Sequence, residues 1–184
     1  MAGGFNFAPD ADLVRSLVLY REGRPGLTQA LVWLTQLGGA MFLIPFTLVV
    51  AALVWWRSRD FARVGWLLVT IMGGRGAVEL LKWTTNRPRP SFEEHPVTVA
   101  SQAFPSGHAA NSMVAYLAIA LFALPARWRG PGAVAAVALS LMIGATRPIL
   151  GVHWPTDVLG GWLFGAAWTW FLWRWFEARQ VTRA

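Results

Sequence analysis

The chain has no cysteine and few charged side chains, and each shortage excludes a class of protein. Without cysteine it has no disulfide framework and no thiolate chemistry. Charged residues make up 14% of its 184 residues, well below the roughly 25% typical of a soluble domain. Hydrophobic residues make up 55%, and 12 tryptophans and 11 phenylalanines are among them. This composition favours a single-domain membrane protein, because aromatic rings concentrate at the bilayer interface.

Acidic residues are also scarce, and the net charge is +7. A positive net charge can indicate a nucleic-acid partner. We see no basic face of a soluble domain and no nucleic-acid-binding motif, so we expect no such partner. In a membrane protein, arginines more often fix the topology or bind phosphate. The N-terminus lacks a basic region followed by an apolar run, so we expect no cleavable signal peptide.

Five stretches are apolar enough to cross a bilayer, which takes about 20 residues. They lie within residues 27–56 and at 64–83, 108–124, 131–150 and 155–176. The first is longer than one span needs, and Gly38, Gly39 and Pro45 would bend it.

Residues 10–20 predict a short interfacial helix, capped by Asp10 or Asp12, with a short sixth span as the alternative. The predicted fold is therefore an all-α, polytopic membrane helix bundle of five or six transmembrane helices. It forms one domain over residues 1–184, with an N-terminal interfacial segment at 1–26.

Arginines predict the orientation of the bundle. With five spans, the arginines at 57–63, at 127–129 and in the C-terminal tail fall on one side, which should be the cytoplasm. The N-terminus, the 84–105 loop and the turn at 151–154 then face outward. The 84–105 loop cannot be helical throughout, because it contains four prolines.

Polar residues gather in three clusters, all on this outer face. The first is "KWTTNRPRP" at 82–90, where Lys82, Arg87 and Arg89 stand close together in the sequence and prolines stiffen the chain. On its own, this cluster is either an anion site or a charged helix end at the interface.

The second cluster is "FPSGHAANS" at 104–112. Ser106 is a good N-cap residue, Gly107 allows close approach of a ligand, and free N–H groups at a helix start bind phosphate. His108 would then be placed to give or take a proton. The alternative is an ordinary cap followed by an interfacial histidine.

The third cluster is "TRPILGVHWPTD" at 146–157. Arg147 presents a fork of donors suited to phosphate oxygens. His153 and Asp157 are spaced i, i+4, so the carboxylate can fix the imidazole tautomer and leave the other nitrogen as a base or nucleophile. The alternative is a carboxylate that merely stabilises the first helical turn, which leaves His153 unexplained.

Together the clusters place three cations, a helix start and two histidines on one face, which fits metal-free phosphoryl transfer. We expect no metal or other cofactor, because the nearby carboxylates lack a ligand-like spacing with both histidines (Glu93, Glu94 and Asp157).

Other residues carry smaller predictions. Arg75 and Glu79 lie at i, i+4 inside a span, so we expect an inward-facing ion pair that supports Lys82. We expect His95 to be exposed in the loop. Three glycines in the last span should allow close helix packing: Gly160, Gly161 and Gly165.

The three blocks resemble the type 2 phosphatidic acid phosphatase superfamily, whose signature is K-x6-RP, then PSGH, then SR-x5-H-x3-D. The first block runs from Lys82 to Arg89-Pro90, and the second is complete at 105–108. The third block has Arg147, His153 and Asp157 at the expected spacing. The chain departs from the pattern at Thr146, where the family has serine, and Pro148 is unusual.

The resemblance implies a role for each matching residue. His153 would be the nucleophile that forms a phosphohistidine, Asp157 would hold its ring, and His108 would protonate the leaving group and later activate water. The phosphate would be bound by Lys82, Arg89, Ser106, Gly107 and Arg147, without a metal. Arg87 is outside the core signature, and we expect it to face lipid phosphates rather than to bind a second phosphate of the substrate.

The chain is thus interpreted as a bacterial cytoplasmic-membrane lipid phosphatase with its active site outside. Candidate substrates are undecaprenyl pyrophosphate, phosphatidylglycerophosphate and phosphatidic acid, and the resemblance to small bacterial members favours the first. The alternatives are a lipid phosphotransferase and a non-catalytic lipid-phosphate binder or transporter. A vanadium haloperoxidase shares the site pattern but is soluble. Membrane lipids are the other expected partners, and the sequence leaves the oligomeric state open.

Overall fold

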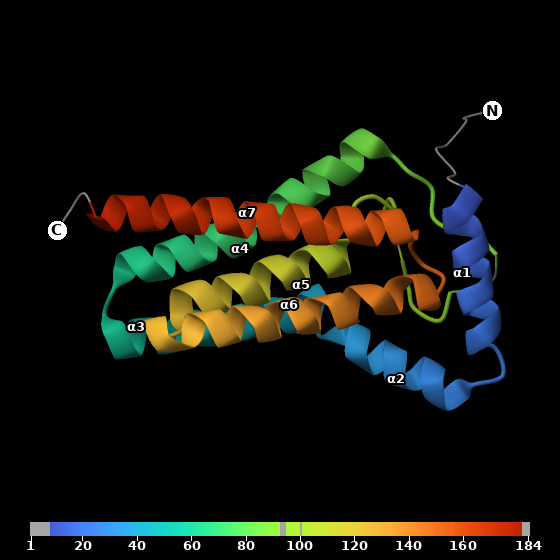
Figure 1. The fold of residues 1–184 in the computed structure, drawn as a ribbon, viewed down its shortest axis with the longest axis horizontal. Helices are drawn as coiled ribbons and strands as arrows, with labels where there is room; N and C mark the ends of the chain where they lie inside the picture. Colours follow the sequence, from blue (N-terminus) through green and yellow to red (C-terminus); the bar gives the residue numbers. More distant parts are fainter. Residues whose placement is uncertain (1–7, 93–94, 100, 182–184) are drawn as a thin grey trace.

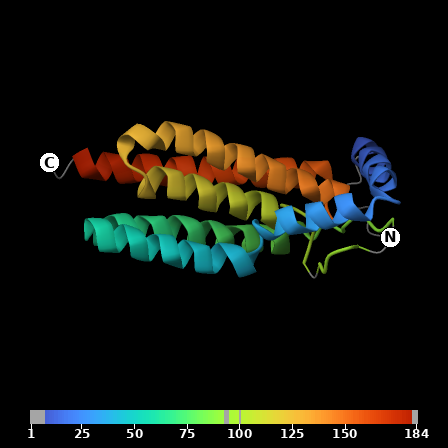
Figure 2. The same cartoon turned by 90° about the horizontal axis from the view of Figure 1, so that it is seen from below.

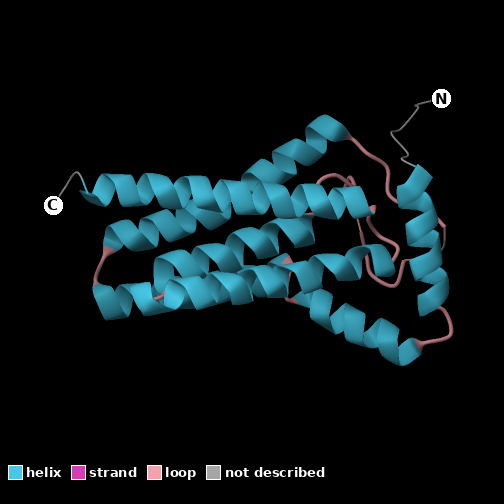
Figure 3. Cartoon of the chain, in the orientation of Figure 1, coloured by secondary structure: helices cyan, strands magenta, loops and turns pink. Residues whose placement is uncertain are grey.

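The computed structural model describes residues 8–92, 95–99 and 101–181, and every regular element in these ranges is a helix (Figure 3). Glu93 and Glu94 lie outside the described residues. The elements are α1 (Ala8–Arg21), α2 (Pro25–Gln36), α3 (Ala40–Ser58), α4 (Phe61–Thr85), α5 (Gly107–Ala118), a π-helical turn (Ile119–Ala123), α6 (Ala126–Ile149) and α7 (Pro155–Val181). The all-α prediction is confirmed.

Helices α3 to α7 run side by side along the long axis of the molecule (Figures 1 and 2). The central helix α5 contacts α4, α6 and α7, and most of its side chains are buried. The core beside it includes Leu67 of α4, Phe122 of the π-helical turn and Trp173 and Phe176 of α7. Helix α5 is therefore held on three sides, which fixes the position of its N-terminus at the site.

Glycines let α7 approach α5 closely, as predicted. A Cβ atom at Gly161 would stand 2.8 Å from the carbonyl oxygen of Ser106, and one at Gly165 would stand 2.8 Å from that of Ala110. At Gly160 a Cβ would lie 2.5 Å from the ring of Phe104. At Gly161 and Gly165 a larger residue would require displacement of the backbone, so the prediction of close helix packing is confirmed for these two, whereas Gly160 makes room for the ring of Phe104 in the α4–α5 connection.

The first predicted span is wrong as a single helix. The chain breaks at Gly38 and Gly39 into α2 and α3, and α2 has only 12 residues. A Cβ at Gly38 would lie 2.6 Å from Cγ2 of Ile143 and 3.2 Å from the carbonyl oxygen of His108. The two glycines thus end α2 where the chain passes close to α5 and α6, whereas Pro45 lies inside α3 without breaking it.

Helix α1 lies across the end of the bundle, against the ends of α6 and α7 (Figure 1). Its described part begins at Ala8, so Asp10 and Asp12 both stand inside the helix, and the prediction that one of them caps it is wrong. Among the described residues, three helices are long and apolar enough to cross a membrane: α3, α4 and α6. The number of spans therefore stays a prediction.

The two ends of the bundle differ as the charge pattern predicts. The α3–α4 connection, the start of α6 and the end of α7 lie at one end, and they carry Arg57, Arg59, Arg127 and Arg179. The connection between α4 and α5, the α6–α7 turn and α1 lie at the other end (Figure 1). The three clusters therefore meet at one end of the molecule.

Candidate active site

A cavity of about 180 Å³ lies at this end, between α4, α5, α6 and the two connections. Six of the eight predicted site residues line it: Lys82, Arg89, Gly107, His108, Arg147 and His153. Ser106 and Asp157 are fully buried and are not among its lining residues. The structure thus brings residues from all three sequence clusters around one small cavity.

The turn between α6 and α7 presents His153 to this cavity. Gly151 adopts a left-handed conformation with φ of 75°, which ends α6, and Pro155 then begins α7. The first turn of α7 places Asp157 beside His153, with 3.4 Å between Oδ2 and Nδ1. This contact is an ion-pair distance and is too poorly aligned to count as a hydrogen bond.

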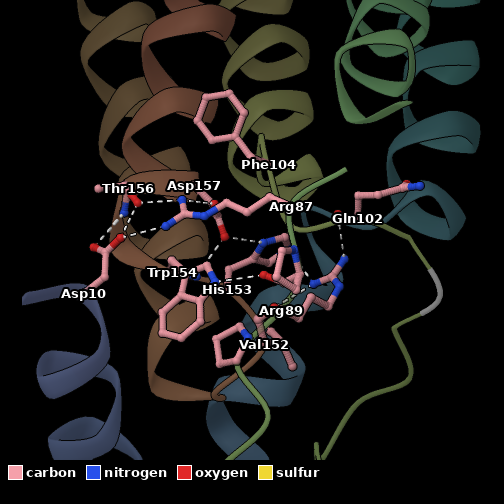
Figure 4. Close-up of polar contacts among 12 residues, drawn as sticks. Asp10, Arg87, Arg89, Gln102, Phe104, Val152, His153, Trp154, Thr156 and Asp157 are labelled. Carbon is pink, nitrogen blue, oxygen red and sulfur yellow. Dashed lines mark hydrogen bonds and ion pairs between the residues drawn. The ribbon is translucent and has the colours of Figure 1, made fainter. Parts of the chain in front are cut away.

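Arg89 fixes the tautomer of His153. Its Nη1 lies 2.9 Å from Nε2 of His153 (Figure 4). A guanidinium can only donate, so Nε2 is the acceptor, and the proton of a neutral ring is on Nδ1, facing Asp157. The lone pair of Nε2 is therefore on the side of the cavity, which is the arrangement that a nitrogen nucleophile requires.

Burial and neighbouring cations keep this imidazole neutral. Burial is the main cause that lowers the pKa of His153 well below its usual range, and the positive charges of Arg89 and Arg147 add to it. Burial also lowers the pKa of Arg89, partly offset by Asp157. The His153 ring therefore keeps its lone pair at neutral pH.

Asp157 is held through both carboxylate oxygens. The backbone N–H of Trp154 donates to Oδ2 at 2.9 Å, and Nη1 of Arg87 donates to Oδ1 at 2.6 Å. The Asp157 carbonyl also accepts the N–H of Ser106 at 2.9 Å. This last bond joins the start of α7 to the start of α5, so the two histidine-bearing segments are positioned together.

The three predicted phosphate-binding cations are each held by a group from another element. Lys82 donates to Oγ of Ser101 at 2.8 Å, and Nε of Arg89 donates to the Ser101 carbonyl at 2.7 Å. Nη1 of Arg147 donates to Oγ1 of Thr35 at 2.8 Å, while its Nε has no hydrogen-bond partner within the described part of the chain. Lys82 and Arg147 thus keep unused donors for an anion in the cavity, whereas Arg89 also donates to the carbonyls of Val152 and Gln102 and would have to exchange a partner to bind one.

The start of α5 forms the floor of the cavity. A Cβ at Gly107 would lie 3.4 Å from Nζ of Lys82, so glycine leaves room for a ligand there. Ser106 occupies the N-cap position, but its side chain makes no capping bond, and its buried Oγ has no hydrogen-bond partner among the residues described. The capping prediction for Ser106 is correct in position and wrong in its bond. His108 lies in the wall, close to Gly38 and Gly39.

Three smaller predictions are wrong. Arg87 does not face lipid, because it contacts Asp10 and Asp157. Arg75 and Glu79 both line the cavity but form no ion pair within 4.0 Å in the described ranges. His95 is half-buried, with Nε2 2.9 Å from the carbonyl oxygen of Pro90.

The departures from the signature have local structural roles. Oγ1 of Thr146 donates to the carbonyl of Ile143 at 2.6 Å, a bond that serine can also make. Pro148 lies in the last turn of α6 and leaves Arg147 on the cavity wall.

The sequence reasoning missed the residues that hold the predicted ones. Ser101 and Thr35 anchor cations, but they are single hydroxyl residues without a motif. The sequence pattern predicts only a capping role for Asp10. Its one other signal is that the chain has only nine acidic residues, and a carboxylate buried in a membrane protein needs a partner.

Residues 63–180 match the family model of the PAP2 superfamily. The chain belongs to this superfamily. The resemblance seen in the three motif blocks is thereby confirmed, and the site described above is the cavity of a PAP2 protein.

Several PAP2 relatives are phosphatases of lipid phosphates. Phosphatidylglycerophosphatase B of Bacillus subtilis is 32% identical over 162 residues, which cover 85% of this chain and 77% of that protein. The undecaprenyl-diphosphatase of Sulfolobus acidocaldarius is 26% identical over 154 residues, 79% of this chain and 68% of that protein. A lipid A 1-phosphatase of Rhizobium etli is 33% identical over 115 residues, which cover 58% of this chain and 46% of that protein. These names agree on the class of reaction and differ in the lipid.

Two solved structures share the fold. The crystal structure of the transmembrane PAP2-type phosphatidylglycerolphosphate phosphatase of Bacillus subtilis superposes with a TM-score of 0.85 and 28% identity, over 93% of this chain and 86% of that one. The structure of LpxE of Aquifex aeolicus gives a TM-score of 0.68 at 23% identity, over 92% of this chain and 97% of that one. At this identity it supports the fold alone. The helix arrangement is therefore that of the superfamily.

Proposed function

We propose that this PAP2 protein is a metal-independent lipid phosphate phosphatase that acts through a phosphohistidine at His153. The observation that carries the proposal is the environment of its ring. Nδ1 faces the carboxylate of Asp157, while Nε2 accepts from Arg89 on the cavity side. One nitrogen is thus oriented and the other is available to attack.

In the first step, the lone pair of Nε2 attacks phosphorus and the bond to the lipid oxygen breaks. The bound phosphate takes the hydrogen bond of Arg89 from Nε2, which frees the lone pair. His108 donates a proton to the departing oxygen. The imidazole becomes cationic as the N–P bond forms, and Asp157 stabilises this charge from the Nδ1 side.

In the second step, water attacks the phosphorus and gives a proton to His108. The N–P bond breaks and its electron pair returns to Nε2, so inorganic phosphate leaves and the site is restored. Lys82, Arg89 and Arg147 stabilise the charge on the phosphoryl oxygens in both steps. Atoms and protons balance over the cycle with water as the only co-substrate.

The charge of the cavity supports a mechanism without a metal. Among the described residues there is no group of three or more histidine, aspartate or glutamate side chains that could hold an ion. The cavity wall carries the three cations Lys82, Arg89 and Arg147. These would repel a divalent cation and can themselves neutralise the phosphoryl oxygens.

The substrate proposal rests on helix α4. Arg75, Glu79 and Lys82 are spaced i, i+4, i+7, so they share one face of α4, and all three line the cavity. Arg75 lies about 10 Å from Lys82 along the helix axis. This separation suits a second phosphate beyond a glycerol spacer better than the adjacent phosphate of a pyrophosphate. Glu79, between them, can accept from a glycerol hydroxyl.

We therefore propose phosphatidylglycerophosphate as the preferred substrate, with undecaprenyl pyrophosphate as the second candidate. The similarity to phosphatidylglycerophosphatase B over 85% of the chain supports the same choice.

A substrate panel tests the proposed function. Phosphate release in detergent is measured from phosphatidylglycerophosphate, undecaprenyl pyrophosphate and phosphatidic acid, with and without EDTA. We expect the highest kcat/KM for phosphatidylglycerophosphate. EDTA should not lower the activity, because the cationic side chains of the protein neutralise the phosphoryl oxygens in place of a metal. Abolition by EDTA would contradict the metal-free mechanism. An absence of phosphate with an acceptor-dependent phospholipid product would identify a phosphotransferase.

We also propose that the site end faces the outside of a bacterial cytoplasmic membrane, because the exposed Arg57, Arg59, Arg127 and Arg179 lie at the other end, against Arg15 and Arg24 at the site end. The chain has no cysteine, so single cysteines report accessibility. Ser91→Cys, in the connection at the site end, should react with a membrane-impermeant maleimide in intact cells. Ala126→Cys, at the start of α6, should react only after lysis. The reverse pattern would contradict the orientation.

A further inference from the structure

Four residues form a buried polar network behind the cavity: Asp10, Arg87, Thr156 and Asp157 (Figure 4). Arg87 is at its centre. Nη1 donates to Oδ1 of Asp157 at 2.6 Å and to Oγ1 of Thr156 at 2.8 Å, and Nη2 donates to Oδ2 of Asp10 at 3.1 Å. None of the four is among the residues that line the cavity. Within the described residues, the network reaches the cavity through Asp157, which contacts His153.

Arg87 determines which oxygen of Asp157 faces the nucleophile. The terminal torsion of an aspartate is soft, so one bond would leave its carboxylate plane poorly defined. Arg87 occupies Oδ1, and the remaining oxygen, Oδ2, accepts the Trp154 N–H and faces His153. Two points of attachment hold the carboxylate in the orientation that the imidazole needs.

Arg87 also compensates the charge of Asp157. The carboxyl side chains of Asp10 and Asp157 are 5% and 0% exposed, and the arginine between them is 13% exposed. Removing the guanidinium would leave two buried carboxylates facing each other without their shared cation, which is strongly unfavourable. One of them would then take up a proton or turn away. A neutral or rotated Asp157 cannot stabilise a cationic His153.

Asp10 in turn holds Arg87 in place. The single hydroxyl proton of Thr156 goes to Oδ2 of Asp10, because its oxygen accepts from Arg87. The Thr156 N–H also donates to Asp10, at 3.3 Å. Asp10 therefore ties helix α1 both to Arg87 and to the first turn of α7.

Apolar packing fixes the helix that carries Asp10. Val14 and Val18 of α1 are buried against Ala103 and Trp154. Trp154 also donates from Nε1 to the carbonyl of Pro88, next to Arg87. Helix α1 lies before the stretch 63–180 that matches the superfamily model, yet its packing places the carboxylate of Asp10 beside Arg87.

We propose that Arg87 and Asp10 are positioning residues for the phosphoryl-transfer step. Arg87 holds Asp157 ionised and facing His153, and helix α1 holds Arg87 through Asp10. This inference rests on the proposed function, because it takes His153 as the nucleophile. None of the hydrogen bonds found for Lys82, Arg89 or Arg147 goes to Arg87 or Asp10, so phosphate binding should be largely preserved without them.

The test uses the full-length protein in detergent with the substrate that wild type hydrolyses best. We expect Arg87→Ala to lower kcat by about 100-fold and Asp10→Asn by about 10-fold, the range typical of residues that orient an imidazole from behind. In both variants KM should stay within about threefold of wild type, because the phosphate-binding cations are intact. The matched control is Asp12→Asn on the exposed side of α1, which should leave kcat unchanged.

Rescue distinguishes positioning from a structural role. Methylguanidinium at millimolar concentration should restore part of kcat in Arg87→Ala and nothing in His153→Ala. Arg87→Lys should fall between Arg87→Ala and wild type, because one ammonium cannot bridge both carboxylates in the geometry of a guanidinium.

Other outcomes overturn the inference. An unchanged kcat in Arg87→Ala, or a raised KM with normal kcat, would show that Arg87 does not act through Asp157. If Arg87→Ala does not fold, Asp10→Asn keeps the side-chain volume and decides the question by its kcat. A wild type inactive on every lipid phosphate, or an active His153→Ala, would instead show that the proposed function is wrong.

Discussion

Replacing His153 by alanine is expected to lower kcat for lipid phosphate hydrolysis by about 10⁴-fold or more, a loss typical of removing a covalent nucleophile. The ring is 1% exposed and makes contacts to Arg89 and Asp157 that no other side chain can replace. Initial rates with phosphatidylglycerophosphate measure the effect. KM is not informative here, because too little turnover remains.

The matched control is His95→Ala, the same substitution in the α4–α5 connection at the same end of the molecule. His95 contacts the Pro90 carbonyl and does not line the cavity, so we expect a change of less than about threefold in kcat. A His153→Ala protein that keeps more than about one tenth of wild-type kcat would exclude His153 as the nucleophile.

Replacing Arg147 by methionine is expected to lower kcat/KM by about 100-fold to 1,000-fold, the usual cost of removing one donor to the developing charge. Arg147 is 3% exposed, and within the described ranges only Thr35 accepts a hydrogen bond from its guanidinium, so its other donors can bind an anion in the cavity. Arg147→Lys should recover little of the activity, because a single ammonium cannot reproduce the fork that spans two phosphate oxygens.

The control for this substitution is Arg127→Met, at the exposed start of the same helix α6. We expect normal kcat/KM for the control. Thermal unfolding in detergent separates the two effects of Arg147→Met, because exchanging a buried cation for an apolar side chain of similar size leaves stability unchanged or raises it. A low Tm together with low activity would indicate a structural role for Arg147 instead.

The sequence alone predicts those parts of the site and the fold that depend on residues close together in the chain. The i, i+4 spacing predicts that His153 and Asp157 share a face if a helix starts near His153. Helix α7 starts two residues later, at Pro155, and the turn before it still places Nδ1 of His153 3.4 Å from Oδ2 of Asp157. The positions of Gly160, Gly161 and Gly165 likewise predict a close contact between helices, although the sequence does not name the partner helix. The three motif blocks converge because five antiparallel helices return them to one end.

The sequence was insufficient where two distant segments share a bond. Nothing near Asp10 shows that it contacts Thr156, 146 positions later. The sequence around Arg87 predicts a contact with lipid, because its partner Asp10 lies in a distant helix. The break at Gly38 had a similar cause. Glycine lowers helix propensity, but only the proximity of His108 and Ile143 explains why the chain separates into two helices there.

The central claim, that the reaction passes through a phosphoryl group on His153, is tested most directly by rapid quenching. Wild-type enzyme is mixed with substrate labelled in its terminal phosphate, quenched in alkali during the first turnover, and digested. If His153 carries the phosphoryl group, we expect a label that is stable in alkali, labile in acid, and located on the peptide that carries His153. Turnover of the substrate with no label on that peptide, or with label on another residue, would contradict it.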